Sequence, residues 1–329
     1  MSLLFVIVLS LATTSLTAFA ESVVTQTFTL HPGWNAIFLE VEPNPKDMAS
    51  AFNGVPIAGV WTWNPEGLGR QYIQNPSEAL IKESDWRVYF PPSRGEDPFL
   101  TNLFFLQANR AYLVEVTGNN NVTWTISGQP SLKRREWITN SFNLTGFAVD
   151  PNVPPAFNPF FASSKAHKGQ AIYRLSNSGI WEFVQNPSST NMRSGEAFWI
   201  YTEGPSKFEG PLLVRPDSGF DLHFYKELSQ RILKVKNISS VTKTISLKLI
   251  NADAAFPLLK FTLDNDANEK WVAFGPVESV LLAPGKEGIF RLAVRRADMT
   301  TSIVNAIIEI SDGAGALYKI PISAEKGGI

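Results

Sequence analysis

The chain has 329 residues, of which 44% are hydrophobic and 18% charged, and this length is enough for two or three packed domains. Its formal net charge of -1 provides no overall field that would attract nucleic acid or an anionic membrane surface. The absence of cysteine excludes disulfide bonds, thiolate metal sites and cysteine nucleophiles. The three histidines, His31, His167 and His223, are widely separated and have no metal-ligand spacing.

Residues 1–20 are predicted to be a signal peptide. Leu3–Leu9 is an apolar core, and Ala18-Phe19-Ala20 has the small-x-small pattern of a cleavage site. The alternative, a membrane anchor, is disfavoured because the apolar run is short and interrupted by Ser and Thr, whereas a spanning helix needs about 20 apolar residues. We therefore expect a mature chain that begins at Glu21 and an exported protein. It would be secreted, extracellular or at the cell surface, and the periplasm stays open as a further compartment.

An internal repeat organises the first two thirds of the chain. The segment Gly33–Pro45 returns as Phe142–Pro154: an aromatic-Asn pair opens each copy, an apolar run follows, and an acidic residue, Pro and Asn close it. Further matches follow in the same order, among them Tyr72–Pro76 with Phe183–Pro187. We predict two degenerate β repeats, at residues 21–132 and 133–216.

In repeat 1 the patterns predict strands at 23–30 and 34–41, a short helix at 46–52, and a hairpin of strands 57–63 and 70–74. Repeat 2 is expected to follow the same order, with one short helix of its own. Residues 77–106 form an insertion without a counterpart in repeat 2. Because it is rich in aromatic residues and Pro, we expect an extra hairpin or ordered flap there.

Residues 217–329 have a different pattern, in which strand candidates alternate with turn signals about every ten residues. The candidates are 232–236, 244–250, 258–263, 271–274, 280–282, 289–294, 306–310 and 318–322. The Pro-Gly turn at Leu281–Gly285 and the strand after it resemble those of immunoglobulin-like accessory domains. The predicted fold class is therefore all-β: two small repeated β modules, each with one short helix, followed by an immunoglobulin-like β-sandwich.

The two repeats resemble the Gly-Trp-Asn modules that occur in tandem in secreted and surface-exposed bacterial proteins. The opening motif is Gly33-Trp34-Asn35, and Gly195–Ile200 matches the later aromatic strand. Repeat 1 departs from the pattern at Asn109–Tyr112, which lacks the Gly, and repeat 2 departs at Ser141-Phe142, which replaces Gly-Trp. The resemblance implies extracellular architecture and no chemistry.

Comparison of the copies separates folding residues from candidate ligand-binding ones. Bulky side chains match at Trp34 and Phe142 and at Tyr112 and Phe198, which favours a packed core. We interpret Gly33, Trp34, Asn35, Phe142 and Asn143 as a structural motif in which each Asn bonds to backbone at a strand start. The aromatic residues that the comparison does not explain are the candidate ligand-binding residues: Trp86, Tyr89, Trp124 and Trp181.

Other polar motifs are less distinctive. Asp264, Asp266 and Asn268 place oxygen atoms at alternate positions, as a Ca²⁺ loop would, but the alternative is a polar turn between strands. No other cofactor is predicted. The basic run Lys133–Glu136 is interpreted as a solvated linker between the repeats. Glycosylation sequons begin at Asn121, Asn143 and Asn237.

No motif for nucleophilic, phosphate-binding or metal-dependent catalysis is present in the sequence. We therefore expect a non-enzymatic surface or extracellular-matrix protein that acts as a structural or adhesive binding module. The alternative is a carbohydrate-binding protein that uses aromatic residues of the insertion. An enzyme with paired carboxylates is a third hypothesis, since sequence alone does not exclude one. The expected partners are other surface proteins or polysaccharide, and not nucleic acid.

Overall fold

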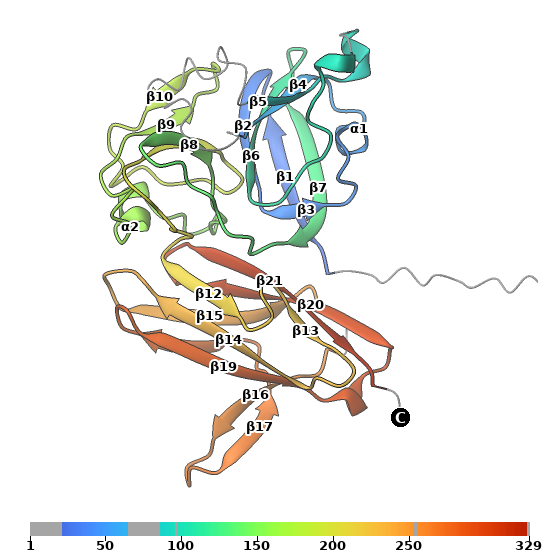
Figure 1. Cartoon of the computed structure of the whole chain (residues 1–329), viewed down its shortest axis with the longest axis vertical. Helices are drawn as coiled ribbons and strands as arrows, with labels where there is room; N and C mark the ends of the chain where they lie inside the picture. The colour runs from blue at the N-terminus through green and yellow to red at the C-terminus, as the bar shows by residue number, and fades with distance from the viewer. Residues whose placement is uncertain (1–21, 65–85, 96–97, 253–255, 328–329) are drawn as a thin grey trace, which may run out of the picture.

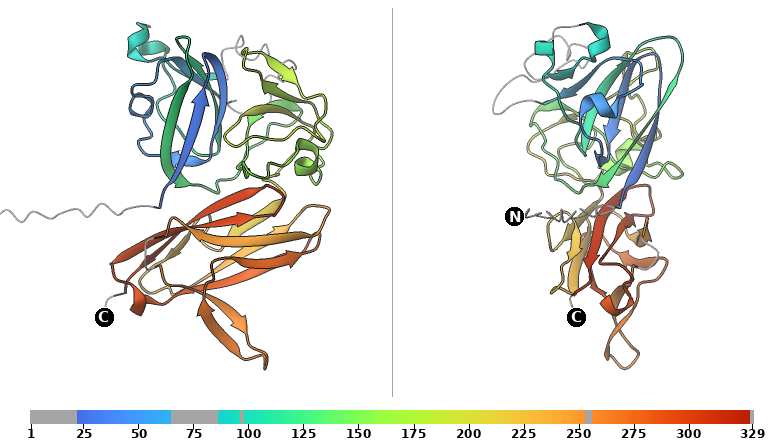
Figure 2. Two further views of the ribbon diagram at one scale, coloured as in Figure 1. Left: turned by 180° about the vertical axis from the view of Figure 1, so that it is seen from behind. Right: turned by 90° about the vertical axis from the view of Figure 1, so that its right-hand side faces the viewer.

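The computed structural model describes residues 22–64, 86–95, 98–252 and 256–327, and almost all regular structure in them is β (Figure 1). The expected signal peptide and the expected strand at 70–74 lie outside the described residues. No helix within the described ranges has the length and apolar character needed to cross a membrane. Two β modules lie side by side above a β-sandwich, as Figures 1 and 2 show from three directions.

Repeat 1 contains two sheets. The first has the order β1-β7-β3 and the second β2-β6-β4-β5. Their strands are β1 (Val24–Leu30), β2 (Gly33–Leu39), β3 (Val41–Pro43), β4 (Ile57–Trp63), β5 (Trp86–Tyr89), β6 (Arg110–Val116) and β7 (Val122–Pro130). β1 shows why these segments are strands: its threonines at 25, 27 and 29 are exposed, while Gln26, Phe28 and Leu30 between them are buried.

The predicted helix forms as α1 (Met48–Ala51), where Asp47 accepts a hydrogen bond from the Ser50 N–H at 2.9 Å. Two short 3₁₀ helices, η3 (Pro92–Arg94) and η4 (Pro98–Leu100), lie in the insertion. The insertion also supplies β5, which pairs with β4 in the register Trp63 to Trp86. The prediction that the insertion is an added hairpin or flap is therefore wrong for this part of it, because β5 is a strand of the repeat's own sheet.

Repeat 2 has one sheet, with the order β10-β9-β11-β8. Its strands are β8 (Ser141–Thr145), β9 (Ile172–Leu175), β10 (Trp181–Phe183) and β11 (Phe198–Thr202), and its helix is α2 (Phe157–Phe161). Read in the other direction, this order is β8-β11-β9-β10, and it matches β2-β6-β4-β5 of repeat 1 strand for strand. β10 is therefore the counterpart of β5. The next strand, β12 (Leu212–Pro216), which the sequence assigns to repeat 2, pairs instead with β14 of the sandwich.

The two repeat asparagines have the predicted role. Asn35 Oδ1 accepts from the His31 N–H at 2.8 Å, and its Nδ2 donates to the carbonyls of His31 and Gly33. Asn143 Oδ1 accepts from the Ile138 N–H at 2.8 Å, and its Nδ2 donates to the carbonyls of Ile138 and Ser141. Each amide thus closes the loop that leads into its strand.

The four-stranded sheets of the two repeats are buried on both faces. In repeat 1, Ile37, Tyr112 and Val114 face the β1-β7-β3 sheet, whereas Trp34 and Leu113 face repeat 2. In repeat 2 one face packs on a phenylalanine-rich core that includes α2, and the other packs on repeat 1. The phenylalanine-rich core of repeat 2 contains Phe157, Phe160, Phe161, Phe198 and Phe208. Alternation along each strand therefore sends one set of side chains into a repeat's own core and the other set into the interface.

Backbone hydrogen bonds also join the repeats. The Phe38 N–H donates to the Gly195 carbonyl at 2.8 Å, and the Ala197 N–H donates to the Ala36 carbonyl at 3.1 Å. This short bridge extends the edge of β2 with a segment of repeat 2. The two repeats are therefore joined by main chain as well as by side chains.

The C-terminal module is a β-sandwich of two five-stranded sheets, β12-β14-β19-β16-β17 and β13-β21-β20-β15-β18. All eight predicted strands are present, and β12 and the short β13 (Leu222–Phe224) are additions to the prediction. The others are β14 (Gln230–Asn237), β15 (Lys243–Ile250), β16 (Leu258–Leu263), β17 (Glu269–Ala273), β18 (Glu278–Leu282), β19 (Glu287–Val294), β20 (Ile303–Ser311) and β21 (Leu317–Glu325), with η5 (Arg296–Asp298) between β19 and β20. The predicted immunoglobulin-like β-sandwich and the all-β fold class are confirmed. The β16–β17 hairpin extends away from the body of the sandwich (Figures 1 and 2).

His167 is buried in the core of repeat 2, with 1% of its surface exposed. Its ring lies 4.1 Å from that of Trp137, its Nδ1 is 2.6 Å from Ser164 Oγ, and its Nε2 is 3.2 Å from Thr202 Oγ1. Thr202 Oγ1 also accepts from Asn143 Nδ2, so the imidazole and the repeat asparagine share one buried hydroxyl. Burial disfavours the charged imidazolium and lowers the pKa of His167 from 6.5 to about 4.

This histidine predicts an acid-dependent loss of stability. Between pH 6.5 and pH 4 the unfolded chain binds a proton at His167 that the folded chain does not bind, so stability is fully present above pH 6.5 and falls as the pH drops to 4. The loss is on the order of 3 kcal/mol. Urea denaturation of wild type and His167→Gln over this pH range should show the dependence in wild type and a flatter profile in the variant. The control is His223→Gln, at a partly exposed histidine of the sandwich; equal pH profiles for wild type and His167→Gln would contradict the assignment.

Candidate functional site

The candidate ligand-binding aromatics do not form a surface platform. Trp86, Tyr89 and Trp124 are 6%, 8% and 3% exposed, and Trp181 is half-buried. Trp124 stacks between Phe28 and Phe52 and donates its indole N–H to the Ala51 carbonyl at 2.8 Å. A sugar ring needs an open aromatic face, so the prediction that these residues present one is wrong for the three buried side chains.

Trp86 and Trp181 instead have corresponding places around Trp199, which is fully buried between the repeats. Their ring centroids lie 6.3 and 6.1 Å from that of Trp199, both in edge-to-face geometry. Trp63 approaches the same ring at 5.5 Å. These tryptophans therefore hold the two repeats together.

The candidate Ca²⁺ loop is closed by its own hydrogen bonds. Asp264 Oδ1 accepts from the backbone N–H groups of Asp266 and Asn268 at 3.0 and 2.9 Å, and its Oδ2 accepts from Asn268 Nδ2. The bonds from Asn268 and Asp266 lower the pKa of Asp264. The arrangement is that of a polar turn at the tip of the β16–β17 hairpin. Over the described residues, no three His, Asp or Glu side chains are grouped to hold a metal ion.

Lys133, Arg134 and Glu136 of the linker are exposed, in agreement with the solvated interpretation, whereas Arg135 is partly buried. The guanidinium of Arg135 lies 3.9 Å from the ring centroid of Phe147 and donates to Thr145 Oγ1 at 2.7 Å. Burial lowers the pKa of Arg135 to about 10, while the charges of Tyr318, Glu209 and Glu40 act in the opposite direction. Arg135 lines a cavity of about 70 Å³ where the two repeats meet the sandwich. At its wall, Lys319 of the sandwich is 3.3 Å from Glu40 of repeat 1.

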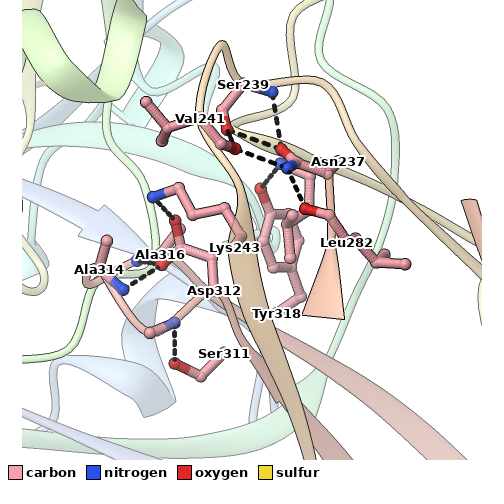
Figure 3. Close-up of polar contacts among 12 residues, drawn as sticks. Asn237, Ser239, Val241, Lys243, Leu282, Ser311, Asp312, Ala314, Ala316 and Tyr318 are labelled. Carbon is pink, nitrogen blue, oxygen red and sulfur yellow. Dashed lines mark hydrogen bonds and ion pairs between the residues drawn. The ribbon is translucent and has the colours of Figure 1, made fainter. Parts of the chain in front are cut away.

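A buried ion pair shapes the sandwich turn that contacts repeat 2 (Figure 3). Asp312 Oδ2 accepts from Lys243 Nζ at 2.8 Å, and its Oδ1 accepts from the N–H groups of Ala314 and Ala316. The same turn bonds to repeat 2: the Asp150 N–H donates to the Gly315 carbonyl at 2.9 Å, and Leu317 donates to Ala148. The ion pair thus fixes the turn on which repeat 2 rests.

Asn237 forms a second buried network beside this turn (Figure 3). Its Nδ2 donates to the carbonyls of Val241 and Leu282, both at 2.8 Å, and its Oδ1 accepts from the Ser239 N–H and hydroxyl. Asn143 and Asn237 are both buried and bonded, so their sequons are inaccessible in the folded chain, whereas Asn121 is exposed.

The largest open hollow described lies on repeat 2, beside the β9–β10 hairpin, with a volume of about 600 Å³. Its exposed lining includes amide, charged and aromatic side chains: Asn177, Glu182, Phe183, Gln185, Asn186 and Arg193. A second hollow of about 200 Å³ shares Ser176, Asn177 and Arg193 with it and reaches His31 and Trp34 of repeat 1. We call the two together the rim groove.

The rim groove has a fixed polar floor. Arg174 donates from Nε to Glu196 Oε1 at 2.8 Å and from Nη2 to Glu196 Oε2, and its Nη1 donates to the Asn191 carbonyl. The hairpin above it is held by bonds between Ser176 and Ile180. Sequence analysis missed the groove because residues 176–179 carry only a turn signal, and the walls come from segments that are distant in the chain.

Comparisons with known proteins add little beyond the β architecture. No family model and no curated protein matches the chain. The collagen-binding surface protein ACE of Enterococcus faecalis matches at 10% identity over 94% of this chain and 85% of that chain, with a TM-score of 0.21. A CsuC–CsuE chaperone and tip-adhesion-subunit complex of Acinetobacter baumannii matches at 12% identity over 36% of this chain and 58% of that chain, with a TM-score of 0.21. At these TM-scores we draw no functional conclusion from the likenesses.

The contact between repeat 2 and the sandwich predicts a position-specific effect of adding one methyl group. A Cβ at Gly315 (φ +103°) would lie 2.2 Å from the Val153 carbonyl oxygen, whereas at Gly219 (φ +108°) nothing lies within 4 Å. Gly219→Ala should cost about 1 kcal/mol through backbone conformation alone. Gly315→Ala should cost a further ~1–3 kcal/mol through overpacking and should increase protease cleavage near the linker at 133–140. Equal free energies of unfolding for the two variants would contradict the tight contact.

Proposed function

We propose that this chain is an exported, non-enzymatic binding protein that acts at a cell surface or in an extracellular matrix. The observation that carries the proposal is the rim groove, which is open, polar and built on a rigid pair of repeats. Its floor charges, Arg174 and Glu196, are engaged with each other rather than left to react with a substrate. The remaining exposed lining offers hydrogen bonds and one aromatic ring, a chemistry suited to holding a ligand.

The export pattern of residues 1–20 and the resemblance of the repeats to Gly-Trp-Asn modules support a location outside the cytoplasm. The near-zero formal charge supports protein or polysaccharide partners over nucleic acid. The chain would act as a structural or adhesive module in which the sandwich and the repeats together place the groove.

One cluster favours the competing hypothesis of an enzyme. Ser323 Oγ hydrogen-bonds to His223 Nδ1, and His223 Nε2 lies 3.0 Å from Glu325 Oε1, which is the order of groups in a serine-hydrolase triad. However, Ser323 lies within β21, between β13 and β20, so its backbone is part of the sheet and provides no free oxyanion donors. None of the hollows described above is lined by these three residues.

A non-enzymatic protein should leave Ser323 unreactive. We expect no covalent adduct when the mature chain is incubated with a fluorophosphonate probe and analysed by intact mass, because without oxyanion donors nothing stabilises the negative charge that develops on the phosphonyl oxygen during attack. A single adduct that Ser323→Ala abolishes would contradict the proposal. A known serine hydrolase in the same reaction is the positive control.

Surface binding predicts saturable reattachment to cells. The labelled mature chain, added to washed cells of the producing strain, should bind with a plateau and should be displaced by unlabelled chain. We expect a dissociation constant of about 1 μM, which corresponds to a binding free energy of about -8 kcal/mol. Recovery of the protein from culture medium alone, together with non-saturable binding to cells, would contradict a surface role.

A further inference from the structure

The shape and lining of the rim groove indicate the class of its ligand. We propose that it binds a neutral polysaccharide chain, an inference that rests on the binding function proposed above. The two hollows share Ser176, Asn177 and Arg193 in their linings, and together they extend from the β10 edge of repeat 2 to His31 and Trp34 of repeat 1. An extended, hydroxyl-rich polymer can contact two adjacent open hollows at once, whereas a compact small molecule would occupy only one.

Exposed hydrogen-bonding groups line the rim groove. Asn177 lies at the tip of the β9–β10 hairpin, whose ends are fixed by the Ser176 N–H to Ile180 carbonyl bond at 2.8 Å and the Gly179 N–H to Ser176 carbonyl bond at 2.9 Å. The exposed amides of Gln185 and Asn186 line the same hollow. Each amide both donates and accepts, as sugar hydroxyls do, so it can pair with a hydroxyl in either direction.

The charge balance of the groove favours a neutral ligand over a polyanion. Arg174 and Glu196 neutralise each other at the floor. At the rim the exposed Arg193 lies 3.7 Å from Glu196, and Glu182, the cross-strand partner of Arg174, provides an exposed negative charge. A uronic acid polymer would meet these carboxylates as well as the arginine, whereas neutral hydroxyls can bond to both.

Phe183 provides the apolar contact that sugar rings use. Its ring is 45% exposed and is held edge-to-face against Tyr173, with centroids 5.6 Å apart. No other large apolar side chain of the groove's lining is exposed. A polypeptide ligand would require deep apolar pockets for anchor residues, and a single exposed ring fits the flat face of a pyranose better.

Affinity gel electrophoresis of the mature chain tests the proposal. The gels contain galactomannan or xyloglucan as neutral probes, alginate as an acidic probe, and poly-glutamate as a polypeptide probe. We expect retardation by at least one neutral polysaccharide, reduced at least about tenfold in affinity in Asn177→Ala/Arg193→Ala and in Phe183→Ala, since each change removes ligand-facing groups. The matched control is Asn265→Ala/Arg295→Ala, at exposed positions of the sandwich, with thermal unfolding confirming that all variants fold.

The other outcomes overturn the proposal. Retardation by alginate or poly-glutamate alone would assign a different ligand class, and neutral-gel retardation that the groove variants leave unchanged would place the site elsewhere. Absence of retardation in every gel would exclude the polysaccharide assignment. If the same groove variants still reattach to cells saturably, the surface-binding function stands without the groove. If wild type itself does not bind to cells saturably, the proposed function is overturned.

Discussion

The constraint on which the structure depends is that neither four-stranded repeat sheet can cover both of its own faces. Alternation along β11 sends Phe198 and Ile200 into the core of repeat 2 and Trp199 toward repeat 1. Trp199 would be exposed in an isolated repeat, and it is fully buried in the pair. Burial of a tryptophan-rich face on this scale contributes several kcal/mol. The repeats are therefore one structural unit, and their junction rather than their separate surfaces determines where a groove can form.

The sandwich packs against both repeats and is part of the same structural unit. Its turn around Gly315, fixed by the Asp312–Lys243 pair, bonds to repeat 2, while Lys319 contacts Glu40 of repeat 1. Arg135 lies between all three modules and stacks on Phe147. Replacing one partner of such a buried polar group leaves the other unsatisfied, so these contacts favour one relative arrangement of the modules. A fixed arrangement keeps the two hollows of the rim groove, one on repeat 2 and the other lined by both repeats, in place relative to each other.

Local patterns predicted the local structure well. Alternation and turn signals located the sandwich strands from β14 to β21 and the strands β1, β2 and β4 of repeat 1, and the matched asparagines indicated their own backbone bonds. The pairing partner of β4 was assigned wrongly because Tyr72–Pro76 matches repeat 2 in letters, while β5 is the strand that pairs. Likewise, the alternation of side chains along a strand indicates which face of the strand Trp86 lies on, but it does not indicate that a second sheet covers that face. The groove left no signal because Asn177 and Arg193 are surface residues that only the fold brings together.

Hydrogen exchange of the mature chain tests the central claim, that the two repeats form one continuous body. The amides of Phe38 and Ala197 cross between the repeats through hydrogen bonds to Gly195 and Ala36. We expect both amides to be as strongly protected as those of the β2–β6 ladder, since they should open only when the repeats separate. Rapid exchange at both amides, with protection retained inside each repeat, would contradict it and would show two modules that are joined only by their linker.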